Sequence, residues 1–167
     1  KQGKETLYTV RIFPIGGFVR LEGEDESSDD PNALSKKPFL VKPNKQELEE
    51  LYQIAIESKS QLIECAKKIQ LEGAKNVLVS LGGEGAVLLT EHRDIYMAKA
   101  PEGKLVNGVG AGDSMIAGFL AGYMEKENYE FAFKMAVAAG SASAFSKNFA
   151  HRQSVEELLS KIQIKRI

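Results

Sequence analysis

The sequence predicts an α/β protein with a doubly wound sheet, flanking helices and a short β-hairpin-like leader in front. Three observations support this fold class. The run Asn76–Leu81 is rich in β-branched residues and leucine and precedes two glycines, which is typical of a strand buried on both faces of a parallel sheet. Apolar residues recur at helical spacing before this run and again after Asp113. Near the start of the chain, side chains alternate as they do in half-buried strands.

The first 21 residues are expected to form the leader. Apolar and polar side chains alternate from Thr6 to Ile12, and they alternate again over Phe18–Leu21. Pro14 and the glycines at 16 and 17 lie between these two segments and favour a turn. Residues 1–21 are therefore predicted to form a β-hairpin or two short strands.

An acidic segment follows the leader. Glu22–Asp30 has six acidic residues in nine positions and no large apolar side chain, and Pro31 comes next. Such a segment buries too little apolar surface to fold by itself, so residues 22–37 are predicted to be a solvated linker. A cation site in this segment is the less favoured alternative. The α/β unit is then expected to span residues 38–167.

A strand and a helical segment open the α/β unit. The strand is expected near residues 39–43, where an apolar run ends at a proline. Asn44 and Glu47 have the spacing of a capping box, which predicts a helix start. Helical spacing continues from there to about Leu71, and Gly73 closes it. The apolar residues at this spacing are Leu48, Leu51, Tyr52, Ala55, Leu62, Cys65, Ala66 and Ile69.

Two more strands and three helices are predicted downstream. The strands fall near residues 85–90 and 94–99 and are expected to pair. The helix that follows Asp113 should be buried, because its small residues allow neighbouring backbone to approach closely. An alanine-rich helix is expected over about residues 129–145. Ser154 is the predicted N-cap of a last amphipathic helix.

Composition argues against several classes of function. The chain has 167 residues, 43% of them hydrophobic, which suffices for one domain with a core or a core plus an appended piece. With 22 basic and 23 acidic residues there is no basic field, so nucleic-acid binding is not expected. No window approaches the run of about 18 apolar residues that a spanning helix needs, so stable membrane insertion is not expected either. A cytoplasmic location is expected, because no signal-peptide pattern opens the chain.

The cysteine and the histidines are not expected to be ligands. Cys65 is a single cysteine, which cannot form an internal disulfide, and it falls on an apolar helix face, so we expect it in the core. His92 and His151 are far apart in the sequence and lack metal-ligand spacing, so exposed or capping positions are favoured.

The segment Gly110–Asp113 has the chemistry of an anion site. Its glycines let the backbone turn into a helix, where free N–H groups and the helix dipole favour a phosphate or a developing oxyanion. An acid beside such a site makes sense if Asp113 accepts a proton from a substrate hydroxyl while the amides stabilise a transferring phosphoryl group. Magnesium normally bridges the phosphates in such a transfer. A plain helix N-terminus with an acidic cap is the alternative.

The longer stretch VNGVGAGDSMIAGF, residues 106–119, resembles the second signature motif of the ribokinase-like (phosphofructokinase B) carbohydrate kinase family. The resemblance implies that Asp113 is the catalytic base and that Gly110, Ala111 and Gly112 form the anion hole. The Val-Asn opening and the Ser-Met pair after the aspartate are similar to the subgroup of 1-phosphofructokinases and tagatose-6-phosphate kinases.

Three other segments extend the resemblance. Asn44 and Glu47 resemble the family's Asn-x-x-Glu motif, which implies an indirect role at Mg²⁺ and is compatible with a plain capping box. Residues 80–85 resemble the glycine-containing turn beside the nucleotide, with an ordinary turn as the alternative. Residues 138–142 resemble the small-residue helix that borders the adenine, with close helix packing as the alternative. The nucleotide contacts implied in this way are Ser80, Gly82, Gly85, Gly112, Ala139 and Ser143.

The resemblance covers about residues 37–163 and implies a partial, ribokinase-like doubly wound sheet. The implied activity is ATP-dependent phosphoryl transfer to a sugar phosphate with Mg²⁺, from fructose 1-phosphate to fructose 1,6-bisphosphate. The first half of such a kinase, with its sugar-binding acid, is not visible here, so impaired activity is expected. A non-catalytic nucleotide-binding remnant is the alternative. The oligomeric state stays open, with a homodimer as one option.

The leader carries a second resemblance. Residues 5–37, ETLYTVRIFPIGGFVRLEGEDESSDDPNALSKK, are similar to a segment of the site-2 protease family of membrane zinc metalloproteases. The segment lacks that family's His-Glu-x-x-His motif, so no proteolytic role is expected. The two resemblances meet near Lys37, which predicts a fusion of two partial genes, natural or artificial, or an error of assembly.

Overall fold

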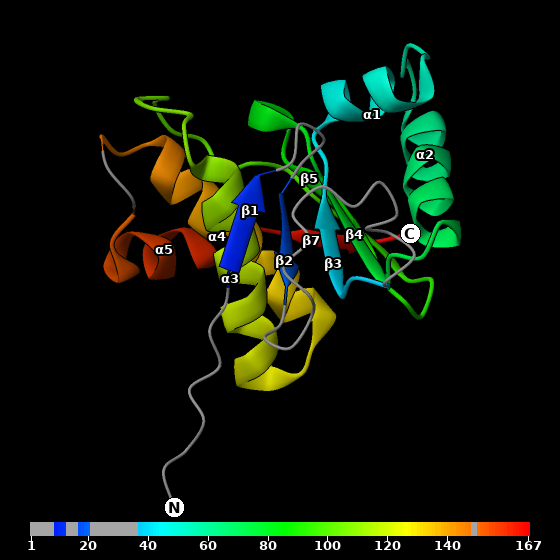
Figure 1. Cartoon of the computed structure of the whole chain (residues 1–167). Coiled ribbons are helices and arrows are strands. Elements are labelled where there is room, and N and C mark those ends of the chain that lie inside the picture. Colours follow the sequence, from blue (N-terminus) through cyan, green and yellow to red (C-terminus); the bar gives the residue numbers. More distant parts are fainter. Residues whose placement is uncertain (1–8, 13–16, 21–36, 148–149) are drawn as a thin grey trace, which may run out of the picture.

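The structure is a computed structural model that describes residues 9–12, 17–20, 37–147 and 150–167. These residues form a seven-stranded sheet in the order β1 to β7, with helices packed on it (Figure 1). The strands are β1 (Thr9–Ile12), β2 (Gly17–Arg20), β3 (Leu40–Lys42), β4 (Asn76–Ser80), β5 (Ala86–Leu89), β6 (Ile95–Ala98) and β7 (Ile164–Arg166). The α/β fold class is confirmed, as are the predicted strands at 39–43, 76–81, 85–90 and 94–99.

The sheet is mixed, whereas the apolar run of β4 had suggested a parallel one. β3 and β4 are parallel, and β4–β5, β5–β6 and β6–β7 are antiparallel. The reason is the length of the connections. A short turn with a 3₁₀ segment at Gly82–Glu84 returns the chain directly from β4 into β5, and a connection that short can join only antiparallel strands.

The leader forms the predicted pair of strands. β1 and β2 are antiparallel, with Thr9 opposite Arg20, and β2 in turn pairs antiparallel with β3. The predicted turn between β1 and β2 and the acidic linker at 22–37 fall almost wholly outside the described residues, which include only Lys37 of the linker. The division of the chain into a leader, a linker and an α/β unit stays a prediction.

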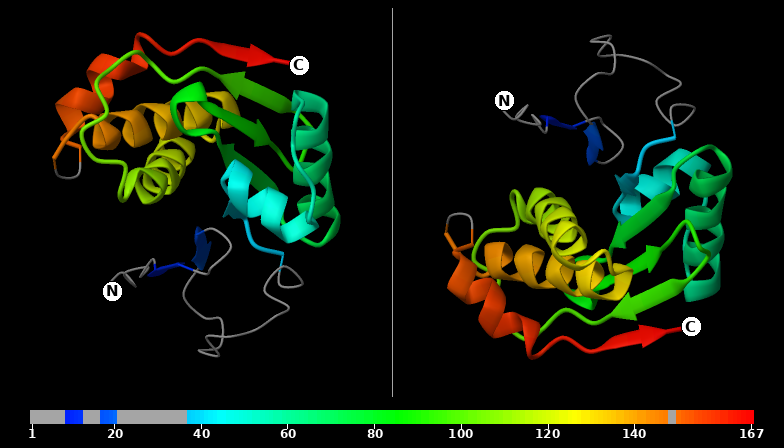
Figure 2. Two further views of the ribbon diagram at one scale, coloured as in Figure 1. Left: turned by 90° about the horizontal axis from the view of Figure 1, so that it is seen from above. Right: turned by 90° about the horizontal axis from the view of Figure 1, so that it is seen from below.

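Helices cover both faces of the sheet (Figure 2). α1 (Lys45–Tyr52) and α2 (Lys59–Leu71) lie on one face, and α3 (Ala111–Lys126), α4 (Tyr129–Ala144) and α5 (Arg152–Leu159) lie on the other. β4 shows why both faces are buried: Val77 and Val79 join the apolar cluster under α1 and α2, while Leu78 joins the cluster under α3 and α4. Cys65 is 1% exposed in the first cluster, so its predicted core position is confirmed.

The predicted helical stretch from residue 44 to 71 is two helices, so that expectation was wrong. α1 ends at Gln53, which adopts a left-handed conformation with φ 51°, and a new capping box of Ser58 and Gln61 starts α2. Ala55, expected on the buried face, is exposed in the connection between them. The capping box at Ser58 is a local signal in the sequence, and it prevails because it satisfies the backbone N–H groups of a second helix start.

Near the C-terminus, the start of α5 differs from the prediction, and the strand β7 was not predicted. α5 begins at Arg152 with His151 at the N-cap, so Ser154 lies inside the helix and is not its cap. The strand β7 was not expected, because three residues are too few for an alternating pattern. It pairs with β6, and Arg166 forms an ion pair with Asp94 at the start of β6.

A helix that crosses a membrane must be long and predominantly apolar. Within residues 37–147 and 150–167, no helix combines the length and the apolar character that a membrane crossing requires.

Candidate active site

The residues of the predicted anion site lie at the start of α3. Gly110 is the N-cap of α3 and has φ 78°, in the left-handed region, which lets the chain turn sharply into the helix. Ala111, Gly112 and Asp113 form the first turn, where backbone N–H groups lack partners inside the helix. The predicted helix start after the glycine turn is confirmed, and the catalytic roles of these residues remain predictions.

A buried lysine lies beside this helix start. Lys42 ends β3, is only 7% exposed, and its ammonium group interacts electrostatically with Glu47 and Asp113. Burial lowers the pKa of Lys42, and the two carboxylates oppose that effect. A Cβ atom built on Gly112 would lie 2.8 Å from Lys42 Nζ, so the end of the lysine lies against the first turn of α3. Sequence reasoning missed Lys42, although a lysine between apolar residues at a strand end was a signal.

Asn44 and Glu47 lie directly after Lys42 and form the predicted capping box. Asn44 Oδ1 accepts a hydrogen bond of 2.8 Å from the Glu47 N–H, and Glu47 Oε2 accepts one of 2.7 Å from the Asn44 N–H. The same backbone also forms a parallel bridge from Asn44 to Ser80 at the end of β4. These bonds hold both side chains at the start of α1 and leave Glu47 Oε1 outside the capping box.

The described residues can be searched for clusters of metal-binding side chains. The structure describes no group of three or more histidine, cysteine or acidic side chains that could hold a metal ion, within the ranges it covers. His92 and His151 are exposed, as expected, and His151 makes no capping hydrogen bond through its side chain. The indirect role of Asn44 and Glu47 toward Mg²⁺, which the resemblance implied, stays a prediction.

The turn at residues 80–85 lies at the same edge of the sheet as Lys42. β3 and β4 are parallel and so end at the same edge. Gly82 and Gly85 have φ values of 57° and 107°, and the Gly85 N–H donates to the Gly82 carbonyl. Ser80, Gly82 and Gly85 are thus grouped at the edge that carries Asn44, while their predicted nucleotide contacts stay untested.

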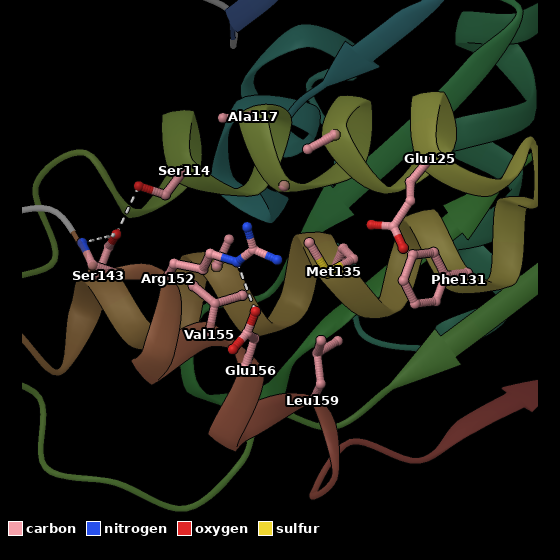
Figure 3. A pocket seen from close by; sticks show the side chains of 14 residues that line it. Ser114, Ala117, Glu125, Phe131, Met135, Ser143, Arg152, Val155, Glu156 and Leu159 are labelled. Carbon is pink, nitrogen blue, oxygen red and sulfur yellow. Dashed lines mark hydrogen bonds and ion pairs between the residues drawn. The ribbon is translucent and has the colours of Figure 1, made fainter.

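Ala139 and Ser143 occupy a different place. They line a groove of about 650 Å³ between α3, α4 and α5, and neither Gly82 nor Gly85 is part of its lining (Figure 3). The Ser143 hydroxyl donates a 2.7 Å hydrogen bond to Ser114 Oγ and accepts one from the Ala150 N–H. These contacts are those of close helix packing, which was the alternative that the sequence left open. They do not bring Ala139 and Ser143 to the turn at 80–85.

A loop before α3 adds apolar side chains that sequence reasoning did not select as candidate contacts. The N–H groups of Val106 and Asn107 both donate to the Ala144 carbonyl at the end of α4, at 2.8 and 3.1 Å. The loop is therefore fixed to α4, while Leu105 and Val109 are 68% and 85% exposed.

The family follows from comparison with known proteins. A model of the pfkB family of carbohydrate kinases matches residues 20–154, which include the helix start, Lys42 and both motif segments. The chain belongs to the pfkB carbohydrate kinase family. The family match begins at residue 20, which is before Lys37, the point where the two resemblances meet. The resemblance of residues 5–37 to site-2 proteases stays a prediction.

Relatives within the pfkB family share both sequence and fold with the chain. The 1-phosphofructokinase of Bacillus subtilis is 44% identical over 135 residues, covering 81% of this chain and 44% of the relative. The 1-phosphofructokinase of Borreliella burgdorferi is 36% identical over 163 residues, covering 98% and 53%. The structure of Arabidopsis thaliana ribokinase complexed with ribose and ATP superposes with a TM-score of 0.69 at 30% identity, covering 77% of this chain and 43% of the ribokinase chain. The chain thus spans about half the length of the relatives it matches.

Proposed function

We propose that the chain carries the phosphate-binding half of a 1-phosphofructokinase-like enzyme, which transfers the γ-phosphoryl group of ATP to fructose 1-phosphate and forms fructose 1,6-bisphosphate. One observation carries the proposal. Lys42, Asp113 and the first turn of α3 meet at one edge of the sheet, so a cation, a base and backbone N–H groups that lack partners inside the helix face one space. The relatives named 1-phosphofructokinase support the choice of substrate.

The residues divide the chemistry of this transfer among them. Asp113 accepts the proton of the attacking sugar hydroxyl, which makes the oxygen a better nucleophile. The N–H groups of the turn from Gly110 to Gly112 stabilise the charge on the transferring phosphoryl oxygens. Mg²⁺, when bound with ATP, neutralises phosphate charge, and the capping box of Asn44 and Glu47 supports it indirectly by presenting a carboxylate oxygen at this edge.

Calorimetric titration with MgATP tests the binding part of the proposal. We expect the unaltered chain and Asp113→Asn to bind, because the base acts only on the sugar hydroxyl. Gly110→Val is expected to lose binding, since valine at φ 78° costs about 1–2 kcal/mol and displaces the N–H groups of the turn. Thermal melting of each variant checks that it is folded. Absence of binding by every folded form would contradict the proposal.

A second candidate is a non-catalytic nucleotide-binding fragment. The matched residues correspond to 44% of the Bacillus subtilis relative, so the chain as given would supply less than half of an enzyme of that length. We therefore expect coupled-assay turnover of fructose 1-phosphate far below the ordinary range of about 1–10³ s⁻¹. Turnover within that range, together with its loss in Asp113→Asn, would show that the second candidate is wrong.

The two capping boxes provide a matched test of the Asn-x-x-Glu motif. Asn44→Ala and Ser58→Ala should each lower the free energy of unfolding by about 1 kcal/mol, because each removes an N-cap acceptor. Only Asn44→Ala should also weaken MgATP binding, since Ser58 caps α2 and is not one of the predicted site residues. Urea denaturation and MgATP titration measure the two effects. Equal MgATP affinity for both variants would remove Asn44 from the site.

A further inference from the structure

We propose that a hollow beside the C-terminal end of α2 is a second ligand site, which binds a small organic dianion that carries an apolar group. The hollow has a volume of about 570 Å³, within the range of about 300–1,000 Å³ that is usual for small-molecule sites. Its lining comes from the end of α2, from the connection between α2 and β4, and from the end of β5 with the turn that follows it.

The hollow lies at the opposite edge of the sheet from Asn44. Lys75 immediately precedes β4, whereas Ser80 at the other end of β4 forms the bridge to Asn44. β5 runs antiparallel to β4, with Leu89 opposite Val77, so the turn after β5 lies at the edge where β4 begins. The hollow is therefore separate from the site of the proposed function.

The hollow has an excess of positive charge, because three of its lining residues are cationic: Lys67, Lys75 and Arg93. Glu91 is the one acid among the described residues that line it. Within the described ranges, neither Lys75 nor Arg93 takes part in an ion pair. Lys67 pairs with Glu64 at 2.7 Å, but exposed pairs of this kind contribute little. Cations that share one hollow repel each other, and a bound dianion relieves that repulsion.

Hydrogen bonds fix the frame of the hollow. The Gln70 side-chain amide donates to the backbone carbonyls of Lys75 and Thr90, at 2.8 and 2.9 Å, and so joins the two connections that line the hollow. The Glu91 carboxylate accepts a 2.5 Å hydrogen bond from the Tyr129 hydroxyl at the start of α4, which engages one of its oxygens outside the cationic group. Because the frame is already ordered, a ligand loses less free energy to ordering of the protein when it binds.

Arg93 has a backbone conformation that is unusual for an arginine. Its φ is 66°, in the left-handed region, and its N–H donates to the Thr90 carbonyl at 2.8 Å. Glycine, asparagine and aspartate adopt this region more readily, because other side chains are strained there. The turn itself therefore does not require an arginine at this position, whereas recognition of an anion does.

The apolar part of the hollow consists of two leucines and an alanine. Leu89 and Ala74 are 2% and 4% exposed and form its floor. Leu71, the last residue of α2, is 88% exposed and forms part of the rim. A ligand whose anionic group lies between the cations can cover Leu71 with an apolar group and remove that surface from water.

An amide NMR titration of the full chain with phenyl phosphate tests the site, because this probe has two negative charges at about pH 8 and one aromatic ring. Amide signals of residues 70–75 and 90–93 should shift as phenyl phosphate is added. Inorganic phosphate, which has the charge alone, should bind more weakly, and benzyl alcohol, which has the ring alone, should cause no shifts. Shifts spread evenly over the chain, or confined to residues 110–113, would overturn the site.

Charge variants test the role of the cations. Lys75→Gln and Arg93→Asn should together lower the affinity for phenyl phosphate about tenfold or more. Asparagine tolerates the left-handed region, so Arg93→Asn should stay folded, which thermal melting checks. Lys68→Gln is the matched control, because it removes the same charge from α2 at a residue outside the lining. Equal losses in the Lys68 variant and in the double variant would overturn the site, since general attraction to a basic surface would then explain the binding.

Leu71→Ser tests the apolar part of the proposal. Leu71 is exposed, so its replacement should leave the protein folded and reduce the affinity for phenyl phosphate to that for inorganic phosphate. Leu105→Ser is the control, because Leu105 is 68% exposed in the loop before α3 and should have no effect. Unchanged affinity in Leu71→Ser, or equal affinity of the unaltered chain for the two phosphates, would overturn the apolar part.

Discussion

Replacing Gly85 with alanine should lower the free energy of unfolding by about 3 kcal/mol or more. Gly85 follows the 3₁₀ turn at Gly82–Glu84, is buried, and has φ 107°, a conformation that side-chain-bearing residues rarely adopt. A Cβ there would lie 2.0 Å from the Ala98 carbonyl oxygen and 2.8 Å from the Ala100 nitrogen. Both atoms are backbone at the end of β6, so relief requires that β5 and β6 separate at this end.

Two neighbouring glycines are controls for that prediction. Gly83→Ala should change the free energy of unfolding by less than about 0.5 kcal/mol, because the space around it is open and its φ is not positive. Gly82→Ala should cost about 1–2 kcal/mol, since it has open space but φ 57°. Urea denaturation of the three variants measures the loss in the free energy of unfolding at each position. A loss at Gly85 no greater than that at Gly82 would mean that backbone strain alone, and not the contact with β6, explains the glycine.

The elements that could be predicted from the sequence are those whose signals are local. The capping box of Asn44 and Glu47 involves two side chains three residues apart, so the start of α1 was visible. The apolar run of β4 predicted a strand buried on both faces, and the two apolar clusters confirm it. The glycine turn before Asp113 predicted a helix start because only the identity of adjacent residues was needed.

The features that were missed depend on residues far apart in the chain. Lys42 lies beside the start of α3 because β3 ends there, and no local pattern brings residue 42 to residue 112. β7 exists because β6 offers it an unpaired edge and Asp94 pairs with Arg166. The direction of β5 followed from a turn short enough to reverse the chain. In each case a tertiary contact decided the structure. Such contacts cannot be read from a single sequence.

The geometry also suggests how packing supports the site. α3 carries Asp113 in its first turn and packs closely on α4 along its whole length, through Gly118 and Gly122 on its own side and Gly140 on α4. The position of Asp113 relative to Lys42 therefore depends on how near α3 lies to α4. A change in the middle of α3 should reach the anion site without touching it.

Gly118→Val tests this dependence and should lower the free energy of unfolding by about 3 kcal/mol. A Cβ on Gly118 would lie 2.6 Å from the Met135 carbonyl oxygen and 2.7 Å from Ala139 Cβ, so the side chain forces α3 away from α4. MgATP affinity should fall as well, because Asp113 and the N–H groups at the start of α3 move with the helix. Urea denaturation and MgATP titration measure the two effects separately.

Ala117→Val is the matched control, since it adds the same β-branched side chain one residue earlier on the same helix. Ala117 is exposed, so the cost should be limited to the lower helix propensity of valine, less than about 0.7 kcal/mol, with MgATP affinity unchanged. If Gly118→Val loses stability but binds MgATP as well as Ala117→Val does, the anion site is independent of the distance between α3 and α4. If both variants lose affinity equally, the helix itself, and not its packing on α4, controls the site.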